Sequence, residues 1–195
     1  MRFLSVFIAT LLFATAAQAH TGVGDASGLS HGFFHPIGGL DHILAMVGVG
    51  LLGFVIGGRA LWLVPASFVA MMALGGALGV AGVAVPFVEL GIALSVVVIG
   101  AALAFGSGVP LALAMALAGG FAVFHGVAHG SEMPLAASGL TYGLGFMAAT
   151  ALLHGVGIGA GFALDKVAGA ASRRAARVGG ALLGLSGLAI LTGVL

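Results

Sequence analysis

The sequence predicts an all-α, polytopic membrane protein with six transmembrane helices that follow a cleavable signal peptide. Hydrophobic residues make up 61% of the chain and charged residues 6%, with a mean hydropathy of +1.28, so a soluble domain would lack the polar surface it needs. The apolar runs are about 20 residues long, which suits membrane-spanning helices, and they lack the alternating polarity of barrel strands. The chain has no cysteine, which excludes disulfides and thiolate metal ligands.

The first 19 residues have the pattern of a secretory signal peptide. Arg2 precedes a short apolar core, and Ala17-Gln18-Ala19 forms a cleavage site of small residues. We expect the mature chain to begin at His20; an uncleaved first helix is the alternative, and in either case the polar segment that follows is exported. Residues 20–34 are then a periplasmic arm that carries histidines, and residues 35–195 form the six-helix transmembrane domain.

Six apolar segments are each long enough to cross a bilayer: residues 36–57, 61–83, 87–105, 111–130, 139–164 and 177–195. An exported N-terminus makes the loops after the first, third and fifth segments cytoplasmic. Every lysine and arginine after the signal peptide falls in or beside these loops, namely Arg59, Lys166, Arg173, Arg174 and Arg177. The positive-inside rule therefore favours a bacterial inner-membrane protein with a periplasmic mature N-terminus.

Many of the 36 glycines recur at small-xxx-small spacing, as in the pairs Gly53 and Gly57, Gly75 and Gly79, Gly155 and Gly159, and Gly180 and Gly184. We expect these pairs to allow close packing of helices within the chain. The same spacing also drives oligomer formation, so the oligomeric state stays open.

The first candidate metal-binding cluster is His35, Asp41 and His42, in the segment that opens with Pro36. Proline suits the first position of a helix. A helix that begins there places His35 and His42 on nearly the same face, roughly 10 Å apart. Asp41 would then lie past the first turn, where a helix dipole no longer favours an acid. Charge at membrane depth is costly, which favours binding of a metal or substrate over a structural role.

The second cluster is His125, His129 and Glu132, at the end of the fourth segment. Their spacing of four and seven residues places all three side chains within an arc of about 60° on a helix. Imidazole and carboxylate groups on one face can each donate a lone pair to a divalent transition metal. A single buried histidine is more often hydrogen-bonded to a carbonyl oxygen, but two histidines with an acid on one stripe favour a metal site.

Together the clusters offer four imidazoles and two carboxylates, provided that the first and fourth segments touch. Nitrogen and oxygen ligands suit Ni²⁺, Co²⁺, Zn²⁺ or Cu²⁺, whereas Ca²⁺ and Mg²⁺ prefer shells of oxygen alone. Four further residues are weaker candidates for metal binding. Glu89 also suits a helix dipole, His154 suits packing or an ion relay, and His20 and His31 lie on the expected arm.

Both motifs, His-x5-Asp-His at residues 35–42 and Phe-His-Gly-x-Ala-His-Gly-x-Glu at residues 124–132, resemble those of the HupE/UreJ nickel permeases associated with hydrogenase and urease maturation. The resemblance covers the signal peptide, the six segments and both motifs. It implies that His35, Asp41, His42, His125, His129 and Glu132 handle the metal. It also implies that the substrate is nickel, with cobalt used by some relatives.

The predicted function is high-affinity nickel or cobalt uptake by a protein that is not an enzyme and needs no resident cofactor. The expected partners are the metal ion and the lipid bilayer, without nucleic acid. An intramembrane metalloenzyme is a rival, but nearly every candidate side chain would be consumed as a ligand. A bis-histidine haem protein is a second rival, disfavoured by the neighbouring acids. A periplasm-facing metal sensor or accessory protein without transport is a third.

Overall fold

The computed structural model describes residues 28–134 and 137–195. The predicted signal peptide and His20 lie outside these residues. The described residues form helices and no strand. The helices are α2 (Gly28–Phe34), α3 (Leu40–Ile56), α4 (Ala60–Val80), α5 (Val88–Phe105), α6 (Leu111–Ser131), α7 (Gly139–Ala168) and α8 (Ser172–Leu191), with short 3-10 helices η2 (Gly106–Gly108) and η3 (Gly169–Ala171).

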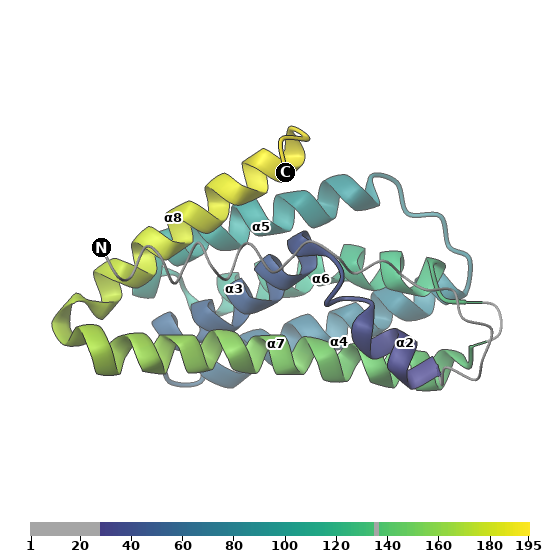
Figure 1. Ribbon diagram of the computed structural model, residues 1–195, viewed down its shortest axis with the longest axis horizontal. Helices are drawn as coiled ribbons and strands as arrows, with labels where there is room; N and C mark the ends of the chain where they lie inside the picture. Colours follow the sequence, from purple (N-terminus) through teal and green to yellow (C-terminus); the bar gives the residue numbers. More distant parts are fainter. Residues whose placement is uncertain (1–27, 135–136) are drawn as a thin grey trace.

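The longest helix, α7, has 30 residues and runs along most of the molecule (Figure 1). Helix α2 packs against the beginning of α7, and α3 packs against its middle. Helix α4 pairs closely with α6, and α8 turns back after η3 to lie along α5. The end of the bundle that holds α2 is therefore far from the α7–α8 turn.

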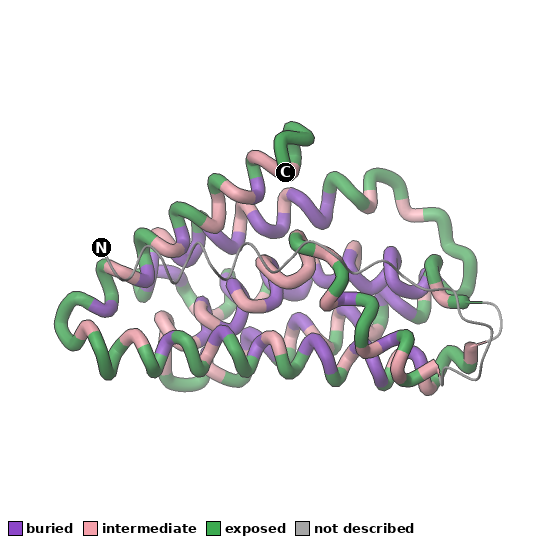
Figure 2. Tube along the Cα trace, in the orientation of Figure 1, coloured by how far each residue is buried: buried purple, intermediate pink, exposed green. Residues whose placement is uncertain are grey.

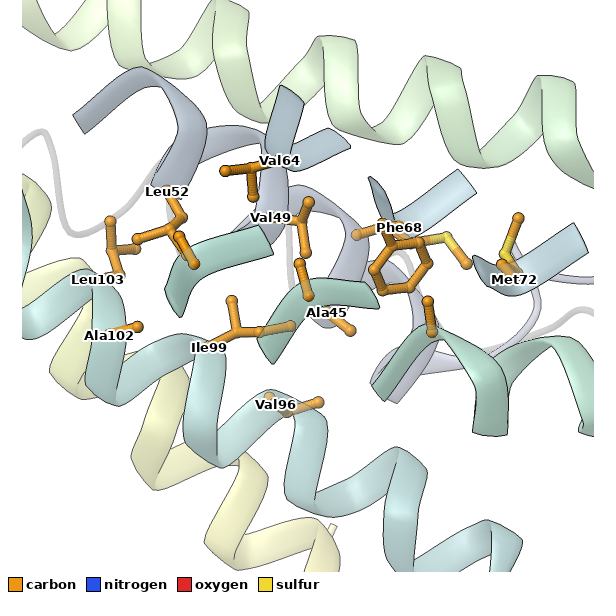
Figure 3. Packing of buried hydrophobic residues seen from close by; sticks show 14 of the residues in the cluster. Ala45, Val49, Leu52, Val64, Phe68, Met72, Val96, Ile99, Ala102 and Leu103 are labelled. Atoms are coloured by element: carbon orange, nitrogen blue, oxygen red, sulfur yellow. The ribbon is translucent and has the colours of Figure 1, made fainter. Parts of the chain in front are cut away.

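Large apolar side chains occupy both the inside and the outside of the bundle. Leu52, Phe68, Met72 and Ile99 are among the fully buried residues that pack where the helices meet (Figure 3). The outward faces of the long helices are exposed (Figure 2) and carry apolar residues such as Trp62, which is 67% exposed. An apolar exterior of this kind suits a lipid environment.

Four segments are long and apolar enough to cross a membrane: Ala60–Val80, Val88–Gly108, Leu111–Ser131 and Gly139–Leu191. The last of these contains α7 and α8. Helix α3 has 17 residues, which corresponds to about 26 Å at 1.5 Å per residue and falls short of a hydrocarbon core of about 30 Å. The chain is thus a helical membrane protein, and the crossing of the bilayer by all six segments stays a prediction.

Close packing through glycine is confirmed for α4 and α6. Gly75 lies against the carbonyl of Val123 and Gly79 against that of Val127, so that a Cβ at either glycine would collide with backbone. Gly180 is packed in the same way against α5. Gly155 and Gly159 have no neighbour within 4 Å of an added Cβ, so the predicted packing role is wrong for this pair.

The basic residues lie at the end of the bundle opposite to α2. Arg59 lies between α3 and α4, and Lys166 lies in the last turn of α7. The predicted bounds 164 and 177 for the loop between the fifth and sixth segments are wrong: Arg173 and Arg174 belong to α8, which begins at Ser172. The Ser172 hydroxyl donates a 2.6 Å hydrogen bond to Asp165 across the turn. The Arg177 Nε atom donates to the carbonyl of Ala104 at the end of α5.

Candidate metal-binding site

The mouth of the site is formed by His35, which precedes α3, and Glu132, which ends α6. His35 lies in the turn after α2, and its backbone N–H donates to the carbonyl of His31. Glu132 is the C-cap residue of α6. The His35 Nε2 and Glu132 Oε2 atoms are 2.9 Å apart, and both side chains are partly exposed. This pair closes one side of a cavity of about 620 Å³ lined by Ser30, His31, Phe34, His35, Gly38, Gly39, Asp41, His42, His129 and Glu132.

The predicted placement of His35 and His42 on one helix face is wrong. Helix α3 begins at Leu40, after the N-cap Gly39 with φ −102° and ψ 124°. The preceding Pro36-Ile37-Gly38-Gly39 segment is a turn rather than a helix because its two consecutive glycines disfavour helix. Asp41 consequently lies in the first turn of α3, and the prediction that it lies beyond the reach of the helix dipole is also wrong.

Asp41 nevertheless has a specific task, which is to orient His42. Asp41 Oδ1 accepts a hydrogen bond from the backbone N–H of His42 at 2.8 Å and lies 2.7 Å from His42 Nδ1. An ionised carboxylate only accepts, so Nδ1 carries the proton and Nε2 keeps a free lone pair. His42 Nε2 is buried and has no hydrogen-bond partner among the described residues. The same carboxylate–histidine arrangement orients metal-ligating histidines in many proteins.

Ser95 of α5 orients His125 in the same way. The Ser95 hydroxyl donates to the carbonyl of Ile92 at 2.6 Å, so its oxygen is left to accept a hydrogen bond from His125 Nε2, 2.9 Å away. The lone pair of His125 then lies on Nδ1, which is buried and unpartnered within the described part of the chain. Sequence reasoning missed Ser95; the signal was a hydroxyl in an otherwise apolar stretch of the third segment.

His129 stands at the centre of the cluster. Its ring centroid lies 4.9 Å from that of His35 and 4.6 Å from that of His42, and His42 lies 4.7 Å from His125. Both nitrogens of His129 are buried without a partner in the ranges that the structure describes. These ring contacts confirm the predicted meeting of the first and fourth segments, here α3 and α6.

The distances between the histidine rings suit binding to one shared ion, whereas the orientations of the rings do not. Two imidazoles bound to one ion at about 2.0–2.1 Å, with ligand angles of about 90–109°, place their centroids about 4.5–5.2 Å apart. The measured separations of 4.6–4.9 Å fall in this interval. As the side chains stand, no group of three or more histidine, aspartate or glutamate residues within 28–134 and 137–195 has the geometry of a metal site. Ring rotations would have to accompany binding.

Of the weaker candidates that the structure describes, His31 lines the same cavity as the cluster, whereas Glu89 and His154 do not. Glu89 is exposed in the first turn of α5, and within the described residues it forms no ion pair with a histidine. His31 lies on α2, which packs against α7, and lines the cavity. His154 is buried in α7, with its ring 5.2 Å from that of Phe68.

Fold and site together define a class: an α-helical membrane protein with histidines and carboxylates gathered at one end of the bundle. The family described as "HupE / UreJ protein" matches residues 8–190, and the chain belongs to this family. The chain is similar to Protein HupE of Rhizobium leguminosarum bv. viciae, with 43% identity over 190 residues that cover 97% of each chain. No solved structure matches the chain.

Proposed function

We propose that this protein takes up nickel ions, with cobalt as an alternative substrate, across the bacterial inner membrane. The observation that supports this proposal most strongly is the group of buried imidazoles whose free lone pairs are set by neighbours: Asp41 leaves His42 Nε2 free, and Ser95 leaves His125 Nδ1 free. Membership of the HupE/UreJ family supports a role in the handling or transport of nickel or a related metal.

In this proposal the ion first meets Glu132 and His35 in the open cavity. The carboxylate attracts a cation, and separation of the 2.9 Å pair frees both groups for the incoming ion. The ion then exchanges water for the imidazoles of His129, His42 and His125. Nitrogen-rich ligation favours Ni²⁺ and Co²⁺ over Mg²⁺ and Ca²⁺, which prefer oxygen.

The membrane potential supplies sufficient driving force. A doubly charged ion that moves inward gains about 4.6 kcal/mol per 100 mV, so uptake needs no ATP hydrolysis on energetic grounds. The orientation follows from charge: the basic residues at the other end of the bundle would face the cytoplasm, and the histidine mouth would face the periplasm. Supply of the metal to hydrogenase or urease maturation is the corresponding physiological role.

Uptake into proteoliposomes tests the proposal. Vesicles that contain the purified protein, with an inside-negative potassium diffusion potential, should accumulate radioactive Ni²⁺ faster than protein-free vesicles, and the rate should fall when the potential is abolished. Tight nickel binding by the purified protein without accumulation would instead establish a binding or sensing protein.

A further inference from the structure

We call His35, His42, His125 and His129 the mouth cluster. His154 is a buried histidine outside this cluster, and no hydrogen bond within the described part of the chain explains its burial. It lies halfway along α7 and is 2% exposed. Neither ring nitrogen has a hydrogen-bond partner among the described residues. An unsatisfied buried polar group costs about 1–3 kcal/mol, and native proteins rarely leave one without a reason. The packing interpretation predicts a hydrogen bond that the described residues do not provide.

Phe68 of α4 contacts both His154 and the mouth cluster. The Phe68 ring centroid lies 5.2 Å from that of His154 and 5.4 Å from that of His125. One turn further along α4, the Met72 sulfur accepts a 3.5 Å hydrogen bond from the Thr150 hydroxyl of α7. Figure 3 shows Phe68 and Met72 in succession along α4. The Thr150–Met72 pair thus lies one helical turn from Phe68 on α4 and one turn from His154 on α7.

The packing of α3 gives the depth of His154 in the bundle. Gly50 of α3 lies against the carbonyl of His154, where an added Cβ would collide with it. Gly50 is eight residues beyond His42, which corresponds to about 12 Å along the helix axis at 1.5 Å per residue. His154 therefore lies deeper in the bundle than the mouth cluster, where α3, α4 and α7 meet.

We propose that His154 is a second, inner metal-binding station, which receives the ion after it leaves His42, His125 and His129 and passes Phe68. This inference rests on the proposed transport function. A single imidazole binds an ion more weakly than the several imidazoles of the mouth cluster do. Conduction requires such a site, since each station must release the ion to the next. An imidazole donor also suits borderline metals such as Ni²⁺ and Co²⁺ better than Mg²⁺ or Ca²⁺.

The first test replaces His154 with phenylalanine, which keeps a ring and removes both nitrogens. Leu152→Phe is the matched control, because it places the same residue at a 54% exposed position of the same helix. We expect His154→Phe to lower nickel uptake into proteoliposomes at least tenfold while nickel affinity in detergent stays within about twofold of wild type. Uptake within twofold of wild type, or equal losses of affinity and uptake, would overturn the proposal.

The second test uses the absence of cysteine from the chain. His154→Cys introduces the sole thiol, a metal ligand, so Co²⁺ added to the purified variant should produce a thiolate-to-cobalt charge-transfer band. Leu152→Cys, with its thiol toward lipid, should give none. A folded His154→Cys protein that binds Co²⁺ at the mouth without this band would overturn the inner station even if His154→Phe does not fold.

The two proposals fail in different ways. If wild-type protein accumulates no nickel at all, the transport function is wrong. If wild-type protein accumulates nickel and His154→Phe does so equally well, transport stands and only the inner station is wrong.

Discussion

Asp41→Asn tests whether a hydrogen bond, rather than direct coordination, makes His42 a ligand. Asparagine keeps the size of the side chain and an oxygen that can accept from the His42 backbone N–H and from Nδ1–H, but it loses the charge. A neutral acceptor holds Nδ1–H less strongly than a carboxylate and makes Nε2 a weaker metal ligand. The hydrogen bond to the carboxylate is 2.7 Å long and largely shielded, since the His42 side chain is 13% exposed.

Loss of such a partner typically weakens metal binding ten- to a hundredfold, which corresponds to about 1.4–2.8 kcal/mol. We expect the Kd for Ni²⁺, measured by equilibrium dialysis of purified protein, to rise by this factor. Loss of the helix-dipole interaction at the start of α3 costs about 0.3–1 kcal/mol of stability, too little to unfold the protein. The maximal uptake rate should recover when nickel is saturating.

Asp165→Asn is the matched control, because it makes the same change at the opposite end of the bundle, where Asp165 accepts a hydrogen bond from Ser172. Nickel affinity should be unchanged in this variant. An Asp41→Asn protein with wild-type affinity would refute the role of the Asp41 carboxylate in making His42 a strong ligand. A rate that does not recover at saturating nickel would show that Asp41 acts in a later step.

Three further predictions concern the same site and its framework. Ser95→Ala removes the acceptor for His125 Nε2–H, and the Kd for Ni²⁺, measured by equilibrium dialysis, should rise about tenfold or more. An unchanged Kd would show that Ser95 does not orient His125 for metal binding. Because protons compete with metal for imidazole, nickel uptake should fall as external pH drops through about 6, and a rate that is flat from about pH 7.5 to about 5 would contradict histidine ligation. Gly126→Ala places a Cβ against the carbonyl of Met72 and should cost about 1–3 kcal/mol, seen as a lower melting temperature in detergent, whereas Gly155→Ala, in open space, should not lower it.

The sequence predicted the helices well because apolar length is a local property. The fourth segment, predicted at 111–130, is α6 at Leu111–Ser131. The sequence also predicted that His125, His129 and Glu132 lie along one helix, and they do: the two histidines lie on α6 and Glu132 is its C-cap. Local patterns suffice wherever the relevant geometry lies within a single helix.

The errors arise where turns and neighbouring helices decide the geometry. Pro36 was compatible with a helix start, but the glycines that follow move the start to Leu40 and place His35 in a turn. The roles of Ser95 and Phe68 depend on which side chains α4 and α5 present to α6, which hydropathy does not encode. The hydrogen bond between His35 and Glu132 joins residues 97 positions apart and likewise requires the packed structure.

The most direct test of the central claim is uptake of radioactive Ni²⁺ by nickel-limited cells that express either the wild-type chain or His129→Ala, with Co²⁺, Zn²⁺ and Mg²⁺ as competitors. His129 contacts both His35 and His42, so its loss should abolish uptake, and wild-type uptake should yield mainly to Co²⁺ and not to Mg²⁺. Uptake that is indifferent to His129, or no uptake by the wild-type chain, would contradict a transport site built on these histidines.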